Sequence, residues 1–246
     1  MYVDWIYNLT STMPYMVAPG NHESECHSPA CLLDLLGKGE KLKNFTAYNA
    51  RWGMPSAQSG GVDAMWYSWN QGAIHFVSCN SETDFKGAGE EKHGDSGVLP
   101  AGGFAPDGEY LKWLEADLAA ARAPGSKTKW IIAGAHRPFG DIAASHGPLF
   151  ARYGVEAYFA GHSHSYSRSG PSTSLDVPTA AEVEAGARAA RSTEYGAVSG
   201  ARGTAQSDGV VINTTATNGT LYVVVGGAGC DEMPLKVKVD DAVGAD

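Results

Sequence analysis

The sequence predicts an α/β fold in which helices pack against a sheet. Short apolar runs alternate along the chain with an amphipathic helical pattern, which is the order expected of α/β layering. Polar clusters directly follow several of these runs, as they do at the carboxyl edge of open α/β sheets, where ligands bind. The 246 residues contain 43% hydrophobic side chains, enough for one sizeable core or two small ones, and we take one domain as the starting point.

The first predicted strands lie in the amino-terminal half. The apolar run at 15–18 is stopped by Pro19-Gly20, which is the form of a buried strand entering a loop. The runs at 65–69 and 73–79 are separated by Asn70-Gln71-Gly72, which predicts a hairpin with glycine in its turn. Residues 82–108 are rich in Gly, Asp and Pro and are expected to form an irregular surface loop.

Helices and strands then alternate. Leucines at helical spacing predict an amphipathic helix over 106–122. A buried strand at 130–133 follows, and a shorter helix is expected at 148–153. The runs at 157–160 and 221–225 predict two further buried strands.

Composition divides the chain into three parts. Residues 1–168 carry the strand and helix patterns of the core. Residues 169–209 are rich in Ala, Gly and Ser with almost no large apolar side chains, so we expect a mobile insertion. Residues 210–246 contain the last core strand and an acidic tail.

The charge balance argues against two classes of partner. The net charge of −9 gives an acidic surface that repels a phosphate backbone, so general nucleic-acid binding is disfavoured. No run approaches the roughly 20 apolar residues of a membrane span, so no membrane partner is expected. Small phosphate esters remain compatible with this charge, because bound metal ions can supply positive charge locally.

Cysteines and glycosylation sequons bear on the compartment. Cys26 and Cys31 lie close enough in a loop-like stretch for a short-range disulfide, whereas Cys79 ends a strand-like run and is expected to be a buried thiol. Glycosylation sequons begin at Asn8, Asn44, Asn213 and Asn218. Together they favour the secretory route. The first residues have neither a basic leader nor an apolar signal core, so we expect the natural amino terminus to lie upstream.

Three polar clusters combine residue types that bind transition metals. They are Gly20-Asn21-His22-Glu23, His136-Arg137-Pro138 and Gly161-His162-Ser163-His164, and each follows an apolar run. Imidazole nitrogen and amide oxygen are suitable ligands for zinc, iron and manganese. Histidines separated by one residue in extended backbone point the same way, so the last cluster can grip one metal or two adjacent metals.

A single histidine at a strand end is more often a structural residue than a ligand, and His27, His75 and His93 are interpreted as structural or surface residues. Three clusters of ligand type in this order, each at a strand end, instead predict a metal site at one edge of the sheet.

The clusters and their flanks resemble a known family. The block 14–23, Pro-Tyr-Met-Val-Ala-Pro-Gly-Asn-His-Glu, resembles the Gly-Asn-His-Glu block of calcineurin-like metallophosphoesterases, with flanks typical of purple acid phosphatases. The block 161–168, Gly-His-Ser-His-Ser-Tyr-Ser-Arg, resembles the closing Gly-His-x-His-x-Tyr-Glu-Arg block. Segments at 44–48, 66–69, 75–78 and 81–85 resemble the same family, most of all its fungal-type members. The likeness runs from about residue 5 to residue 168 and resumes at 221–229.

The resemblance implies a role for each matching metal-binding residue. Asn21, His136 and His162 would bind a divalent metal, usually zinc, manganese or iron in this family, and His164 would bind a ferric ion. His22 would act catalytically, by donating a hydrogen bond to the phosphate or by protonating the leaving alkoxide. The implied reaction is hydrolysis of a phosphate monoester, in which two cations neutralise phosphate oxygens and activate water.

Three further residues match the family less directly. His146 matches loosely the family's other substrate-facing histidine and is taken as the second catalytic candidate. Tyr166 and Arg168 are interpreted as packing residues around the site. Ser167 stands where the family has Glu, so no role is carried over for that carboxylate.

Two earlier blocks of the family, Gly-Asp-x-Gly and Gly-Asp-x-x-Tyr, have no counterpart before Asn21. In the family they supply an Asp to the ferric site, an Asp that bridges both metals, and the Tyr responsible for the purple colour. We therefore expect a partial metallophosphoesterase β-sandwich flanked by helices in αββα layers, lacking its N-terminal strands and leaving a sheet edge unpaired. We also expect one protein ligand in the ferric site and little or no phosphatase activity of this chain alone.

The interpretation taken forward is an acid phosphatase with a dinuclear centre of Fe(III) and a divalent metal, acting on phosphate monoesters in a secreted or vacuolar setting. One alternative within the superfamily is a phosphodiesterase or nucleotide pyrophosphatase, which the metal motifs alone do not distinguish from a monoesterase. An alternative from another class is a non-catalytic metal-binding domain, a pseudoenzyme or fragment, which the absent Asp residues support.

Overall fold

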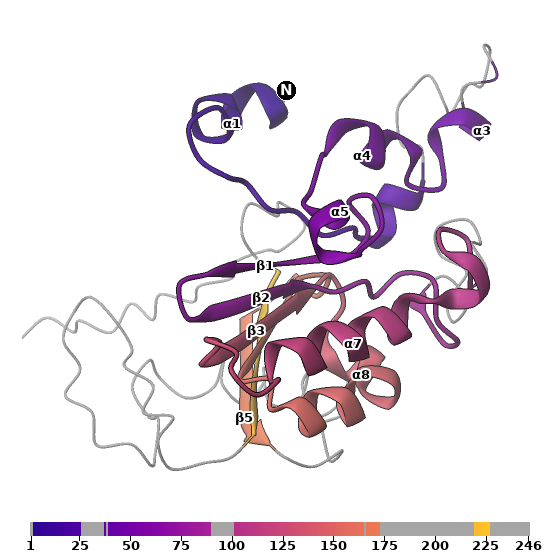
Figure 1. Cartoon of the computed structure of the whole chain (residues 1–246). Coiled ribbons are helices and arrows are strands. Elements are labelled where there is room, and N and C mark those ends of the chain that lie inside the picture. The colour runs from indigo at the N-terminus through magenta and orange to yellow at the C-terminus, as the bar shows by residue number, and fades with distance from the viewer. Residues whose placement is uncertain are drawn as a thin grey trace, which may run out of the picture.

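The structure, a computed structural model, describes residues 2–25, 37, 39–89, 101–164, 166–172 and 219–226. Its strands form one mixed sheet of six strands in the order β1-β2-β3-β4-β6-β5 (Figure 1). The strands are β1 (Tyr67–Gln71), β2 (Ile74–Ser78), β3 (Trp130–Ala135), β4 (Ala157–Ala160), β5 (Tyr166–Ser172) and β6 (Thr220–Val225). The α/β prediction is confirmed, and the second sheet of the predicted sandwich is not among the described residues.

The four inner strands run parallel, so their carboxyl ends lie at one edge of the sheet. β2, β3, β4 and β6 pair in parallel, while β1 and β5 are antiparallel strands at the two edges. In the register of β3 and β4, Ala135 lies opposite Ala160. The residues that follow these two alanines are therefore neighbours, and the Gly161 amide donates a hydrogen bond of 2.8 Å to the His136 carbonyl oxygen.

Two helices that run antiparallel to the inner strands, and therefore parallel to each other, cover one face of the sheet (Figure 1). α7 (Tyr110–Ala121) places Leu114 and Leu118 in the core, and α8 (Phe139–Tyr153) places Phe150 there. Every second residue of β3, beginning at Ile131, is buried against them, because alternate side chains of a strand point to opposite faces. Burial of these side chains is the main favourable term that holds the helices on the sheet.

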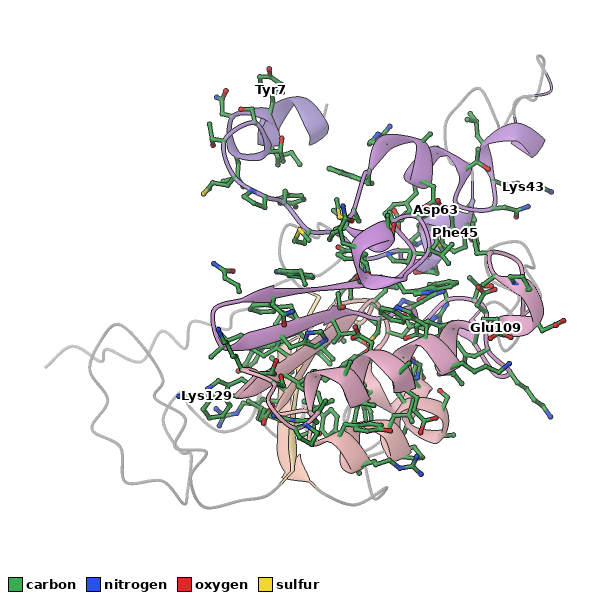
Figure 2. All side chains as sticks on the ribbon, in the orientation of Figure 1. Tyr7, Lys43, Phe45, Asp63, Glu109 and Lys129 are labelled. Atoms are coloured by element: carbon green, nitrogen blue, oxygen red, sulfur yellow. The ribbon has the colours of Figure 1, made fainter. Side chains whose placement is uncertain are left out.

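Shorter helices lie on the β1 side of the sheet (Figure 1). They are α1 (Tyr2–Thr10), η1 (Asn21–Ser24), α3 (Gly39–Leu42), α4 (Thr46–Arg51) and α5 (Ser56–Ser59); η2 (Pro106–Gly108) directly precedes α7. Phe45, which is labelled in Figure 2, directly precedes α4. Its side chain is fully buried, and its ring centroid lies 5.7 Å from that of Phe104. Tyr7, also labelled in Figure 2, is 64% exposed on α1. Among the described residues, no helix combines the length and apolar character of a membrane span.

The face of the sheet opposite α7 and α8 is apolar and partly open. Trp130, Phe159 and Val225 alternate with core residues on their strands and are 46%, 44% and 51% exposed. Next to them, the rings of Trp69 and Phe76 stack with centroids 5.1 Å apart. A groove of about 380 Å³ runs between this face and the backbone of residues 16–18.

The prediction of a strand at 15–18 is wrong. The segment pairs with no strand of the described sheet, and its backbone is held by a side chain instead: the Tyr67 hydroxyl accepts a hydrogen bond from the Val17 amide (3.0 Å) and donates one to the Val17 carbonyl (2.6 Å). An apolar run indicates a buried segment, but that segment forms a strand only where its backbone can pair with the backbone of a neighbouring strand.

Other expectations are confirmed or adjusted at their ends. The hairpin is confirmed, with Gly72 in left-handed backbone (φ 61°) between β1 and β2. The helix expected at 148–153 begins nine residues earlier, because Gly140, Gly147 and Pro148 weaken its sequence signal without breaking it. The expected surface loop at 82–108 begins in the core instead, since Glu82, Thr83 and Asp84 are fully buried.

The remaining expectations concern the cysteines and the carboxyl-terminal part of the chain. Cys79 is a buried free thiol, as predicted, and burial raises its pKa to about 12. β5 continues to Ser172, across the boundary expected at residue 168. The rest of the expected insertion, most of the tail, and the pair Cys26 and Cys31 lie outside the described residues.

Candidate metal centre

Asn21 is the first residue of η1, and the surrounding loop fixes its backbone. The Glu23 carboxylate accepts a hydrogen bond of 2.8 Å from the Gly20 amide, and the Ser24 hydroxyl donates one of 2.7 Å to the Asn21 carbonyl. A Cβ atom on Gly20 would lie 2.8 Å from Glu23 Oε2 and 3.0 Å from His136 Nδ1. Glycine at this position therefore lets the loop approach the end of β3.

His136 directly follows β3 and joins the first and last clusters. Its Nε2 lies 2.7 Å from Asn21 Oδ1 and 3.0 Å from His162 Nδ1. The two imidazole rings meet edge to face, with centroids 4.9 Å apart. The structure therefore brings Asn21, His136 and His162 together at the carboxyl edge of the sheet, from three segments that are far apart in sequence.

The prediction of extended backbone through His162 and His164 is wrong, because these residues lie in a turn. His162 has left-handed backbone (φ 57°), and the Ser163 amide donates a hydrogen bond of 2.7 Å to the Gly161 carbonyl. Gly226, directly after β6, supports this turn: a Cβ atom there would overlap the Ser163 carbonyl oxygen. The turn is therefore set by close backbone packing against the end of β6.

Burial keeps the central imidazoles neutral. It lowers the pKa of His136 to about 3, and the charges of His162, Arg137, His22 and His164 contribute in that order. The pKa of His162 is also lowered, first by burial and then by the Arg137 charge, while Asp141 opposes the shift. A neutral imidazole has a free lone pair, so both rings are in the state that a metal ligand needs.

His22 and His164 lie at the rim of this group. Both side chains are exposed, and the charge of each acts on His136 and His162, which places them nearby. His22 Nδ1 lies 3.6 Å from Glu25 Oε2. Their placement is compatible with contact to a ligand bound above the sheet edge.

His146 lies elsewhere, in the core between α7 and α8. It is fully buried, its Nε2 lies 2.8 Å from the Tyr110 hydroxyl, and its Nδ1 lies 2.8 Å from the Ser145 hydroxyl. The rings of Phe85 and Phe150 meet it edge to face. None of these contacts involves the residues around His136.

His75, interpreted as structural, lies buried on the helix-covered face. Its Nε2 is 2.8 Å from Asp117 Oδ2 and its Nδ1 is 2.9 Å from Asn70 Oδ1. Asp117 also accepts a hydrogen bond of 2.6 Å from Ser68. These contacts link β1 and β2 to α7. His27 and His93 lie outside the described residues.

The donor set fits one divalent ion better than two metals. Two imidazole nitrogens and one amide oxygen converge, and these donors suit zinc, manganese or iron(II). Within the part of the chain that the structure describes, no three side chains of His, Cys, Asp or Glu gather as a metal site. A ferric ion favours oxygen anions, and Asn21, His136 and His162 supply none.

One buried ion pair beside the site was not predicted from the sequence. Arg137 and Glu82 form an ion pair with side chains 2% and 0% exposed. The sequence signal for this pair is weak, because Arg137 simply follows a predicted ligand and Glu82 lies in a segment predicted to be a surface loop.

Comparisons with known proteins agree with these features. A family model described as calcineurin-like phosphoesterase matches residues 2–166. An acid phosphatase of Aspergillus ficuum is 33% identical over 220 residues, which cover 68% of this chain and 36% of that protein. Purple acid phosphatase 15 of Arabidopsis thaliana is 30% identical over 173 residues, covering 66% and 26%. Acid phosphatase type 7 of Mus musculus is 26% identical over 246 residues, covering 92% and 42%.

A solved structure of purple acid phosphatase PPD1 from yellow lupin seeds aligns with a TM-score of 0.45 and 19% identity, covering 92% of this chain and 34% of that one. The chain thus spans less than half the length of each relative that it matches.

Proposed function

Because this chain belongs to the calcineurin-like phosphoesterase family, we propose that it contributes the divalent-metal half of a phosphoric monoester hydrolase of the acid phosphatase type. Its relatives include acid phosphatases and purple acid phosphatases, which favours monoesters over the phosphodiesters or nucleotide pyrophosphates of other superfamily members. The observation that carries the proposal is the meeting of Asn21, His136 and His162 around one imidazole nitrogen.

Each residue of the group has a defined task in this proposal. Asn21, His136 and His162 would hold zinc, manganese or iron(II), and His164 would belong to the ferric site of a complete dinuclear centre. When bound, the two ions would supply positive charge for the phosphate oxygens and a water of lowered pKa. His22, exposed at the rim, donates a hydrogen bond to the phosphate or a proton to the leaving alkoxide.

The catalytic role of His146 stays a prediction, and its contacts favour a different task. The Tyr110 hydroxyl accepts a hydrogen bond from the Asn80 amide and lies 2.8 Å from His146 Nε2. The Ser145 hydroxyl donates to the Ile142 carbonyl, so it accepts from His146 Nδ1. The Nε2 contact therefore joins α8 to Tyr110 of α7, and the Nδ1 contact lies within α8.

We further propose that this chain alone turns over phosphate monoesters weakly or not at all. The support is the donor count: His164 is the single family ligand for the ferric ion in this sequence, because the Gly-Asp-x-Gly and Gly-Asp-x-x-Tyr blocks are absent before Asn21. A secretory or vacuolar setting is supported by the four sequons, the first of which begins at the exposed Asn8 on α1.

Calorimetric titration with zinc tests the metal site. The wild-type chain should bind Zn²⁺, and His136→Ala and Asn21→Ala should each weaken binding at least about tenfold, the loss typical when groups around a metal are removed. His75→Gln is the matched control, because it replaces a buried histidine that contacts other partners. A wild-type chain without zinc affinity would overturn the proposal.

Hydrolysis of p-nitrophenyl phosphate with added iron and zinc tests the second part. Turnover close to that of a full-length acid phosphatase would contradict weak activity of the chain alone. Preferential hydrolysis of bis-p-nitrophenyl phosphate would instead favour the phosphodiesterase alternative. Zinc binding with neither activity would agree with a metal-binding domain.

A further inference from the structure

Arg137, the residue after His136, has a charged side chain that lies buried in the protein interior. The Arg137 Nε lies 3.1 and 3.0 Å from the two carboxylate oxygens of Glu82. Its Nη2 lies 2.9 Å from Glu82 Oε2 at an angle unsuited to a hydrogen bond, so the attraction there is electrostatic. The guanidinium plane is therefore fixed against a carboxylate that is itself out of contact with solvent.

The backbone of Arg137 is fixed by the neighbours on both sides of β3. Its amide donates a hydrogen bond of 3.0 Å to the Ser81 hydroxyl, which follows β2, and its carbonyl accepts one of 2.7 Å from Tyr158 on β4. Ser81 in turn donates to Glu82 Oε1 at 2.8 Å. The side chain and the backbone of Arg137 are thus tied to the same short loop.

The loop leaves no freedom around the guanidinium. Gly89, whose amide donates to the Ser81 carbonyl at 3.2 Å, lies directly over it. A Cβ atom on Gly89 would overlap Arg137 Nε. The pair is enclosed on every side that the structure describes, and small movements of Arg137 would be transmitted to His136.

A buried ion pair adds little to the net stability of a folded protein. The cost of removing two charges from water offsets most of their attraction, and well-packed apolar side chains of similar volume often serve as well or better. What such a pair does provide is direction, because the planar fork of Arg matches a carboxylate in one orientation. Glu82 also neutralises a cation that would otherwise repel a metal ion bound at His136.

From these contacts we propose that the Arg137–Glu82 pair is a positioning clamp that aims the His136 imidazole at Asn21 and His162 and so sets the affinity of this group for a divalent cation. The inference rests on the proposed function for the identity of the bound cation. Arg137 touches neither substrate nor metal in this scheme; it acts through the residue that precedes it.

Zinc affinity and cobalt absorption test the clamp. Arg137→Lys keeps the charge but loses the fork, and it should weaken Zn²⁺ binding about tenfold. The double variant Glu82→Leu with Arg137→Met replaces the pair by apolar side chains, so it should stay folded and still bind Zn²⁺ more weakly. In both variants the visible absorption of bound Co²⁺, which reports the ligand geometry, should change.

Arg122→Lys is the matched control. Arg122 makes the same kind of contacts at the opposite ends of the strands, with the Tyr153 carbonyl and with Glu156. Its replacement should lower thermal stability while leaving the Zn²⁺ affinity within about twofold of wild type, because no ligand lies near it.

Wild-type zinc affinity and an unchanged cobalt spectrum in both folded clamp variants would overturn the inference. If the wild-type chain itself bound no zinc, the proposed function would fail separately. A crystal structure of the double variant would then decide the clamp: a displaced His136 would support it, and an unchanged contact of 2.7 Å between His136 Nε2 and Asn21 Oδ1 would reject it.

Discussion

At the scale of single residues, burial imposes a neutral imidazole on two histidines with different neighbours. The pKa of His136 and of His146 is lowered to about 3, in each case mainly by burial. For His136 the result is a lone pair that stays free for a cation in mildly acidic solution. For His146 the result is a neutral ring whose Nε2 contacts Tyr110 and so joins α8 to α7.

The lowered pKa of His146 predicts a pH-dependent stability. Between pH 6.5, the ordinary pKa of histidine, and about pH 3, His146 is protonated in the unfolded chain but stays neutral in the folded chain. The free energy of unfolding therefore falls as the pH falls. Between pH 6.5 and 5 this contribution is about 2 kcal/mol. His146→Gln, which does not titrate, should lose correspondingly less stability over that range in urea titrations at the two pH values. Equal losses in both proteins would show that His146 is not the sensor.

At the scale of elements, the segment before Asn21 shows how a side chain can replace strand pairing. Residues 14–20 form neither a helix nor a strand, and they lead to Asn21 at the edge where His136 follows β3. Two hydrogen bonds between the Tyr67 hydroxyl and Val17 hold them to the sheet, together with one of 3.4 Å from the Ser78 hydroxyl to the Val17 carbonyl. The position of Asn21 therefore depends in part on a phenol located in β1.

Tyr67→Phe removes both hydrogen bonds and leaves the ring in place. We expect it to lower the free energy of unfolding by about 2 kcal/mol and to weaken zinc binding, because the segment that carries Asn21 is loosened. Tyr153→Phe is the control: its hydroxyl makes one bond of 3.3 Å to the partly exposed Glu115, and its loss should cost less than about 0.5 kcal/mol. Chemical denaturation and zinc titration of both variants would check this, and equal effects would contradict it.

The elements that sequence predicts well are those whose signal is local. The apolar runs gave the position of β2, β3, β4 and β6, and leucine spacing gave α7. The short helices α1, η1, α3, α4 and α5 had no such signal and were not expected. β5 (Tyr166–Ser172) was also not expected, because it is polar and exists by pairing with β6. The burial of Glu82 was equally hidden, since its partner Arg137 is 55 residues away.

The candidate site was predictable in part for the same reason. His136 and His162 follow the neighbouring parallel strands β3 and β4, so their meeting at one edge followed from the topology of the sheet. Asn21 reaches the same edge on a segment that is not a strand, so its contact with His136 did not follow from that topology. Their role as ligands stays a prediction. The direction of His164 was not predictable, because it depends on the left-handed backbone of His162, which sequence spacing does not reveal.

At the scale of the whole molecule, the sheet is covered unequally. Sheets of parallel strands normally have both faces covered, because their strands are apolar on both sides. Here α7 and α8 cover one face (Figure 1), while the side chains of Trp130, Phe159 and Val225 on the other face are about half exposed. An apolar surface of this kind binds dyes and promotes association of the chain.

Phe159→Thr should reduce this behaviour without unfolding the protein. The side chain is 44% exposed and threonine suits a strand, so we expect the free energy of unfolding to stay within about 1 kcal/mol of wild type. Binding of the dye ANS and light scattering should both fall. Tyr7→Thr, which removes an exposed aromatic from α1, should change neither. Unchanged dye binding in Phe159→Thr would show that the open face is not the apolar surface in solution.

The position of β6 between β4 and β5 has a consequence for synthesis on the ribosome. β5 pairs only with β6 in the described sheet, and Gly226 completes the packing beneath the turn of His162. A nascent chain that has emerged only to residue 219 therefore has every histidine of the site but lacks the strand that supports two of them. The geometry of the proposed metal site would therefore be acquired only when β6 joins the sheet.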